Sequence, residues 1–104
     1  MEVINLKTLT DLGLNKIATT YKNSLSHVLY KLDGEEKRLE FFSKKVVGRT
    51  VQAYVFFDEN YKGKITDIRV IDKDGDIVAV DNKVYERTSE KALYVAFKHE
   101  FTEV

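Results

Sequence analysis

The chain has 104 residues with 17 basic and 17 acidic side chains, a formal net charge of zero, and no cysteine, proline or tryptophan. Its length fits a single domain over residues 1–104. Hydrophobic residues make up 43% of the chain and aromatic residues 12%, which is enough for one core and excludes a disordered chain. The absence of cysteine excludes disulfides, thiolate nucleophiles and cysteine-ligated metal centres.

The expected location follows from the same composition. Small secreted domains commonly need disulfides, so a chain without cysteine is expected in the cytoplasm. No stretch is apolar over the length that a membrane-spanning helix needs, and the first residues lack the pattern of a signal peptide. The 13 lysines against 4 arginines are typical of an AT-rich bacterial or phage genome.

The strongest periodic signal lies between Leu14 and Leu32. At about 100° per residue, one arc of about 120° collects eight side chains: Leu14, Ile17, Ala18, Tyr21, Leu25, Val28, Leu29 and Leu32. Only Tyr30 breaks this pattern, and Gly34 follows it as a helix stop. We therefore expect one amphipathic helix over residues 14–32, with His27 on its solvated polar face.

Residues 35–47 fit two structures equally well. Glu40 and Lys44 stand at the i,i+4 spacing that stabilises a helix. The preceding Asp33-Gly34 pair is typical of a hairpin turn, which favours a strand over the same residues. The sequence alone leaves both alternatives open.

From residue 50 onward the apolar period changes to two, which is typical of β-strands. The predicted strands cover residues 50–57, 65–71, 77–80, 84–87 and 92–101, with loops or turns at 58–63, 73–76 and 81–83. Connections this short imply antiparallel neighbours. We expect an α+β fold in which one N-terminal amphipathic helix packs on an antiparallel β-meander of about five strands.

One short segment has the residue types of a metal site. Asp72, Asp74 and Asp76 alternate as the first carboxylates of a calcium-binding EF-hand loop do. The sixth position of that loop should be glycine and is Ile77, and the twelfth should be glutamate and is Lys83. The flanking segments are also strand-like, so we interpret the segment as a solvated hairpin turn and expect no metal site.

Catalytic patterns are sparse. The two histidines, His27 and His99, belong to different predicted elements, and His99 alternates with the apolar face of the last strand. A packed histidine is the more common outcome at such a position. No glycine-rich loop suited to a phosphate is present. We expect no catalytic residues, no cofactor and no enzyme activity.

The large aromatic side chains suggest a surface function. Ten of them lie in or beside the predicted strands, and one helix shields only part of a sheet of that size. Exposed tyrosine and phenylalanine side chains are typical of interaction sites. We expect a small non-enzymatic protein-interaction or regulatory module, with a protein partner or a homodimer, whose candidate surface contains Tyr54, Phe56, Tyr61 and Tyr94.

The alternative function is binding of single-stranded nucleic acid on an aromatic sheet face. Bases stack on exposed rings such as Tyr54 and Phe56, and a neighbouring cation such as Lys98 attracts phosphate. The formal charge is +3 over residues 1–49 and −3 over residues 50–104. The strands of the platform belong to the acidic half, so nucleic acid is not the expected partner.

Overall fold

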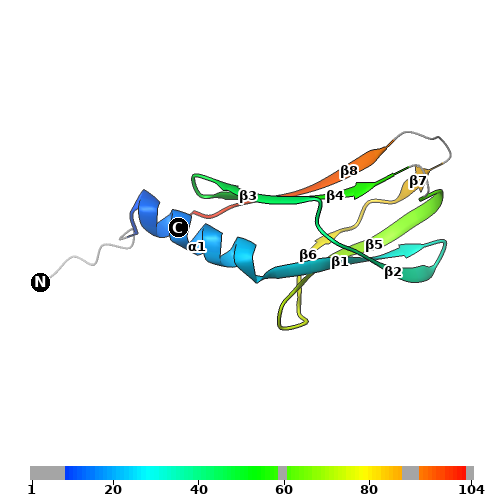
Figure 1. Cartoon of the computed structure of the whole chain (residues 1–104), viewed down its shortest axis with the longest axis horizontal. Helices are drawn as coiled ribbons and strands as arrows, with labels where there is room; N and C mark the ends of the chain where they lie inside the picture. Colours follow the sequence, from blue (N-terminus) through cyan, green and yellow to red (C-terminus); the bar gives the residue numbers. More distant parts are fainter. Residues whose placement is uncertain (1–8, 59–60, 88–91, 103–104) are drawn as a thin grey trace, which may run out of the picture.

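The structure is a computed structural model that describes residues 9–58, 61–87 and 92–102 (Figure 1). Helix α1 spans Asp11–Ser24, and the strands follow in chain order as β1 Leu25–Leu32, β2 Glu35–Leu39, β3 Ser43–Val47, β4 Thr50–Phe57, β5 Gly63–Asp72, β6 Ile77–Asp81, β7 Tyr85–Arg87 and β8 Leu93–Glu100. The predicted α+β class, with one helix before antiparallel strands, is confirmed. Across the described residues, no helix has both the length and the apolar character needed to cross a membrane.

The strands form two antiparallel sheets in place of one meander. The large sheet has the order β2-β1-β5-β6, with β7 also paired to β5, and the small sheet has the order β3-β4-β8. In Figure 1 the small sheet is the upper layer, and β1, β2, β5 and β6 of the large sheet form the lower one. Three hairpins, β1–β2, β3–β4 and β5–β6, lie within sheets, and the chain changes sheet between β2 and β3, between β4 and β5, and between β7 and β8.

Helix α1 extends the lower layer at one end of the molecule, where it lies beneath β3 and leads directly into β1 (Figure 1). Its start is capped by Thr10, whose side-chain oxygen accepts a hydrogen bond of 3.0 Å from the backbone N–H of Gly13. Asp11 in the first turn faces the positive end of the helix dipole. Leu14 and Ala18 are buried where the helix packs on β3 and β4.

The helix ends eight residues before the predicted boundary, because residues 25–32 form strand β1. Tyr30, the one side chain that breaks the helical period, is only 1% exposed and shares the core with Val28. As a strand, this segment hydrogen-bonds to β2 on one side and β5 on the other. The helix prediction is therefore wrong beyond Ser24, and His27 lies in a strand.

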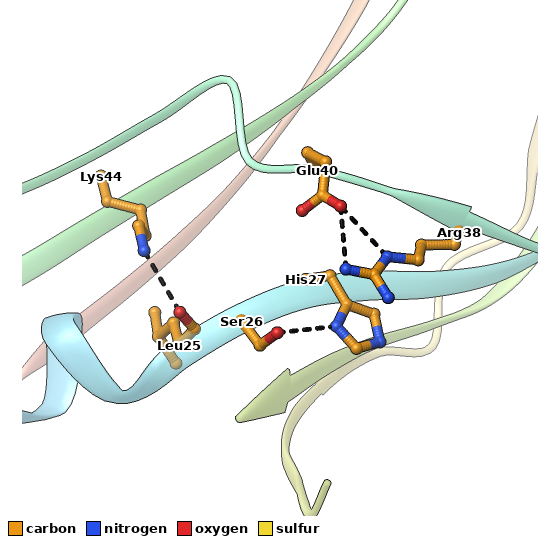
Figure 2. Close-up of polar contacts among 6 residues, drawn as sticks. All are labelled: Leu25, Ser26, His27, Arg38, Glu40 and Lys44. Carbon is orange, nitrogen blue, oxygen red and sulfur yellow. Dashed lines mark hydrogen bonds and ion pairs between the residues drawn. The ribbon is translucent and has the colours of Figure 1, made fainter. Parts of the chain in front are cut away.

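Residues 35–47 form two strands, one in each sheet, so the helix alternative for this segment is excluded. The side chains that supported it have other partners (Figure 2). Glu40 accepts hydrogen bonds of 3.1 and 2.9 Å from the guanidinium of Arg38. The Lys44 ammonium donates a hydrogen bond of 3.2 Å to the backbone oxygen of Leu25, which links β3 to the start of β1.

The core lies between the two sheets. It is built from buried side chains of the two inner faces: Leu25, Val28, Tyr30, Ile65, Ile68 and Val70 from the large sheet, and Ala53, Val55, Phe57, Val95 and Phe97 from the small sheet. From the sequence, we expected part of this apolar face to remain exposed, because one helix cannot cover all of it. That expectation is corrected, because the large sheet covers the part of the small sheet that the helix does not reach.

A buried arginine joins the two sheets at one end of the core. Arg87 in β7 is 8% exposed. Its guanidinium donates hydrogen bonds of 3.0 and 2.9 Å to the backbone oxygens of Phe57 and Asp58. These bonds satisfy carbonyl groups at the end of β4 and attach β7, a strand of the large sheet, to the small sheet.

Two tyrosines should make the fold sensitive to high pH. Burial raises the pKa of Tyr30 to about 12, with a smaller contribution from Tyr61. Burial, and then the hydrogen bond and charge of Asp81, raise the pKa of Tyr85 to about 12. Both phenols ionise near pH 10 in the unfolded chain, so the free energy of unfolding should fall as the pH rises from about 10 towards about 12.

Denaturant unfolding at increasing pH measures this loss. Tyr30→Phe, which removes no described hydrogen bond, should reduce the loss and leave the stability at neutral pH nearly unchanged. Tyr85→Phe should also reduce it, but at the cost of the hydrogen bond to Asp81, about 1 kcal/mol at neutral pH. An alkaline loss of the same size in both variants and in the unmodified chain would contradict the burial of these phenols.

Candidate interaction surface

The outer face of the small sheet carries three of the four predicted surface residues. Side chains alternate along a strand, so burial of Val55 and Phe57 in β4 turns Tyr54 and Phe56 to the opposite face. Tyr94 in β8 pairs directly with Phe56. Tyr54 pairs with Ala96, which is also in β8.

Three rings on this face contact one another. Phe56 and Tyr94 are stacked, with ring centroids 4.7 Å apart. Phe42 lies 5.7 Å from both rings at steeper angles. Each such pair contributes about 0.5–1.5 kcal/mol beyond the area it buries. The contacts hold the rings in place, although Phe42 is 62% exposed and Tyr94 is 56% exposed.

Phe42 was absent from the residues predicted for the surface. The sequence offers one signal for it, the doublet Phe41-Phe42, since adjacent side chains in an extended segment point to opposite sides. Phe41 packs against the core and Phe42 turns outward. Which of the two is exposed depends on how the chain passes from β2 to β3. We use the term aromatic face for Phe42, Tyr54, Phe56 and Tyr94.

Tyr61 lies apart from the aromatic face. Its ring is 5.6 Å from Phe57 and 6.3 Å from Tyr30, both of which belong to the core between the sheets. Its backbone N–H donates a hydrogen bond of 3.2 Å to the backbone oxygen of Asp58. The structure therefore brings three of the predicted surface residues together and places Tyr61 at the edge of the core.

Two lysines stand beside the aromatic face. Lys45 in β3 and Lys98 in β8 are the cross-strand neighbours of Gln52, and all three point outward. The oxygen of the Gln52 side chain accepts a hydrogen bond of 3.0 Å from the Tyr54 hydroxyl. Neither lysine forms an ion pair among the described residues. The local charge is therefore positive, although residues 50–104 are acidic overall.

Two basic side chains elsewhere in the molecule form ion pairs. Arg49 forms an ion pair of 3.3 Å with Glu100 at the far end of the small sheet. Lys37 pairs with Glu35 at 3.2 Å on β2, in the large sheet. Lys45 and Lys98 thus differ from these residues, since nothing in the described part of the chain neutralises them.

The two histidines lie in different sheets. The Nδ1 atom of His27 is 2.9 Å from the hydroxyl of the neighbouring Ser26 (Figure 2). The ring of His99 lies edge-on to Tyr21 at 5.6 Å, and its buried Nε2 has no hydrogen-bond partner among the described residues. Within that part of the chain, no carboxylate hydrogen-bonds to either imidazole.

The aspartates of the β5–β6 turn gather closely. Oxygen atoms of Asp72, Asp74 and Asp76 lie within 4.8 Å of one another. Oδ1 of Asp72 accepts hydrogen bonds of 3.0 and 2.9 Å from the backbone N–H groups of Asp74 and Asp76. The turn predicted here is confirmed, and these bonds to the backbone account for the position of Asp72.

Together these features define a small α+β protein with two packed antiparallel sheets and an outward aromatic cluster on the smaller one. Comparisons of the chain with protein-family models, with curated proteins and with solved structures find no match.

Proposed function

We propose that this protein is a non-enzymatic interaction module that binds a partner protein, or a second copy of itself, through the aromatic face. The observation that carries the proposal is the contact among Phe42, Phe56 and Tyr94 on the solvent side of the small sheet. Large exposed apolar patches are typical of protein–protein contact sites, and tyrosine is enriched among the residues that dominate binding.

The packing of the rings also favours binding. Side chains that must be ordered on association cost about 0.5–1.5 kcal/mol each. The rings of Phe42, Phe56 and Tyr94 already hold one another. Ordering them on association should therefore cost less free energy. Strand β4 holds the backbone of Phe56 in place, because the inner side chains of β4 are buried between the sheets. The cytoplasm is the proposed compartment, consistent with a chain that has no cysteine.

Tyr94→Ser should abolish association and leave the fold intact. It removes the stacked partner of Phe56, so we expect a loss of at most about 1.5 kcal/mol in unfolding free energy. Ile77→Ser is the matched control, since Ile77 is 58% exposed but belongs to the large sheet. Light scattering and co-purification from the source cell should show association for the unmodified chain and the control only. Equal association of both variants, or none with any chain, would contradict the proposal.

Single-stranded nucleic acid is the second candidate, favoured by Lys45 and Lys98 beside the rings. For a single-stranded oligonucleotide, log affinity falls with log salt. The reversals Lys45→Glu and Lys98→Glu should then each make that slope less steep by about 0.7. Tyr94→Leu should weaken that binding because it removes the stacking ring and keeps apolar area. A protein contact should show the opposite pattern, with Tyr94→Leu tolerated better than Tyr94→Ser.

A further inference from the structure

A groove follows the free edge of β8. It encloses about 740 Å³ between residues 94–99 of β8 on one side and residues 80–83 with Tyr85 on the other. β6 and β8 are terminal strands of the two sheets, so the groove is the open seam of the sandwich on this side. Apolar side chains mark its rim. Val80 is 54% exposed and Tyr94 is 56% exposed.

The edge of β8 is suited to pair with another strand. Among the described residues β8 pairs only with β4, so one row of its backbone N–H and C=O groups has no strand partner. All eight of its residues pair with β4 without a register shift, and it contains no proline. Proteins commonly protect such edges with bulges, proline or short strands. The other edge strand of this sheet, β3, has five residues and carries two lysines.

The charge of the groove is not balanced within the described residues. Lys83 and Lys98 lie on its opposite sides, and neither forms an ion pair there. The one carboxylate in the lining, Asp81, accepts hydrogen bonds from the Lys83 backbone N–H at 2.9 Å and from the Tyr85 hydroxyl at 2.7 Å. The groove therefore combines apolar surface, an unpaired strand edge and two available positive charges.

We propose that an extended segment of a partner protein, with alternating apolar and acidic side chains, adds to β8 as a fourth strand of the small sheet. Its backbone bonds to the β8 edge, its apolar side chains enter the groove, and its acidic side chains point to the outer face, where they meet Lys98. This inference rests on the proposed function, because it names the partner segment of the surface to which Tyr94 belongs. A second copy that paired through its own β8 would also bring its own residues 80–85, which lie beside that strand, to the groove. An extended segment has no such wall and can lie in the groove alone.

The test uses capped synthetic peptides of about seven residues, the length of a typical strand. One alternates glutamate with valine, a second alternates lysine with valine, and a third replaces the valines of the first with proline, which cannot donate backbone hydrogen bonds. Amide hydrogen exchange, followed by NMR, reports which strand is covered. We expect the glutamate–valine peptide alone to slow exchange of alternate β8 amides at least about tenfold, with β3 unchanged.

Charge reversal makes the test specific. Lys98→Glu should abolish binding of the glutamate–valine peptide and confer binding of the lysine–valine peptide. Lys45→Glu is the matched control, because it reverses an outward lysine on the other edge strand and should change neither. The proposal is overturned by unchanged β8 exchange at saturating peptide, by protection of β3 in its place, or by β8 protection that rises with protein concentration alone, which would identify a second copy.

The outcome separates this inference from the proposed function. If Tyr94→Ser abolishes association but no peptide slows β8 exchange, the aromatic face stands and strand addition fails. If the glutamate–valine peptide protects β8 while Tyr94→Ser has no effect on association, strand addition stands and the aromatic face fails.

Discussion

Phe57→Ala should lower the free energy of unfolding by about 3–5 kcal/mol, a large part of the about 5–15 kcal/mol typical of a domain. The Phe57 ring is fully buried and packs edge-on against Tyr30 at 5.0 Å and Tyr61 at 5.6 Å. Tyr30 belongs to β1, and Tyr61 lies just before β5. Truncation of Phe57 would therefore leave a cavity between these two segments. Denaturant titration at neutral pH measures the loss.

The adjacent Phe56 is the matched control for this prediction. It has the same chemistry and lies in the same strand, but on the outer face, where it stacks on Tyr94. Phe56→Ala should cost about 1–2 kcal/mol, because its side chain is only partly buried. Similar losses for the two variants would contradict the assignment of inner and outer faces on which the aromatic face depends.

Gly63→Ala is expected to cost about 2–4 kcal/mol. The backbone φ angle of Gly63 is +128°, which side-chain-bearing residues rarely adopt. An added Cβ would also lie 2.9 Å from the carboxyl carbon of Asp33, and closer still to one of its oxygens. The Asp33 carboxylate is held there because it accepts a hydrogen bond of 2.9 Å from the backbone N–H of Lys64. The substitution therefore adds strain and displaces a carboxylate that joins the β1–β2 turn to β5.

Two control variants separate these contributions. Gly75 has a φ of +87° with no atom within 4 Å of an added Cβ, so Gly75→Ala should show backbone strain alone, about 1–2 kcal/mol. Asp33→Gly removes the carboxylate and suits the φ of +52° at that position. In that background Gly63→Ala should be less costly than in the unmodified chain. Strict additivity of the two changes would show that Asp33 does not oppose the added methyl group.

The extent to which the sequence determined the fold is clearest in the strands after residue 50. Their period of two depends only on which side chains are buried, and β4, β5, β6, β7 and β8 lie where that period predicted them. The boundary between α1 and β1 was missed. Leu25, Val28 and Leu32 fit the apolar stripe of a helix, and only Tyr30 indicated a strand. Pairing with β2 and β5 decides the structure there, and such long-range pairing is not visible in a local period.

The candidate surface divides in the same way. Tyr54, Phe56 and Tyr94 follow from alternation along β4 and β8, so the sequence could place them on one face. Tyr61 lies outside the regular strands, where alternation gives no direction, and it packs on the core. The second sheet could not be inferred from composition, because a helix and a sheet satisfy the same need to cover apolar side chains.

Site-specific photo-crosslinking in the source cell tests the central claim most directly. A crosslinking side chain at Phe42 should capture a protein partner or a second copy, while the same group at Ile77 should capture none. Both positions are about equally exposed, at 62% and 58%, so exposure alone cannot explain a difference. Capture from Phe42 only is the predicted result. Equal capture from both positions, no capture from Phe42, or capture of nucleic acid in place of protein would contradict the claim that the aromatic face is a protein-binding surface.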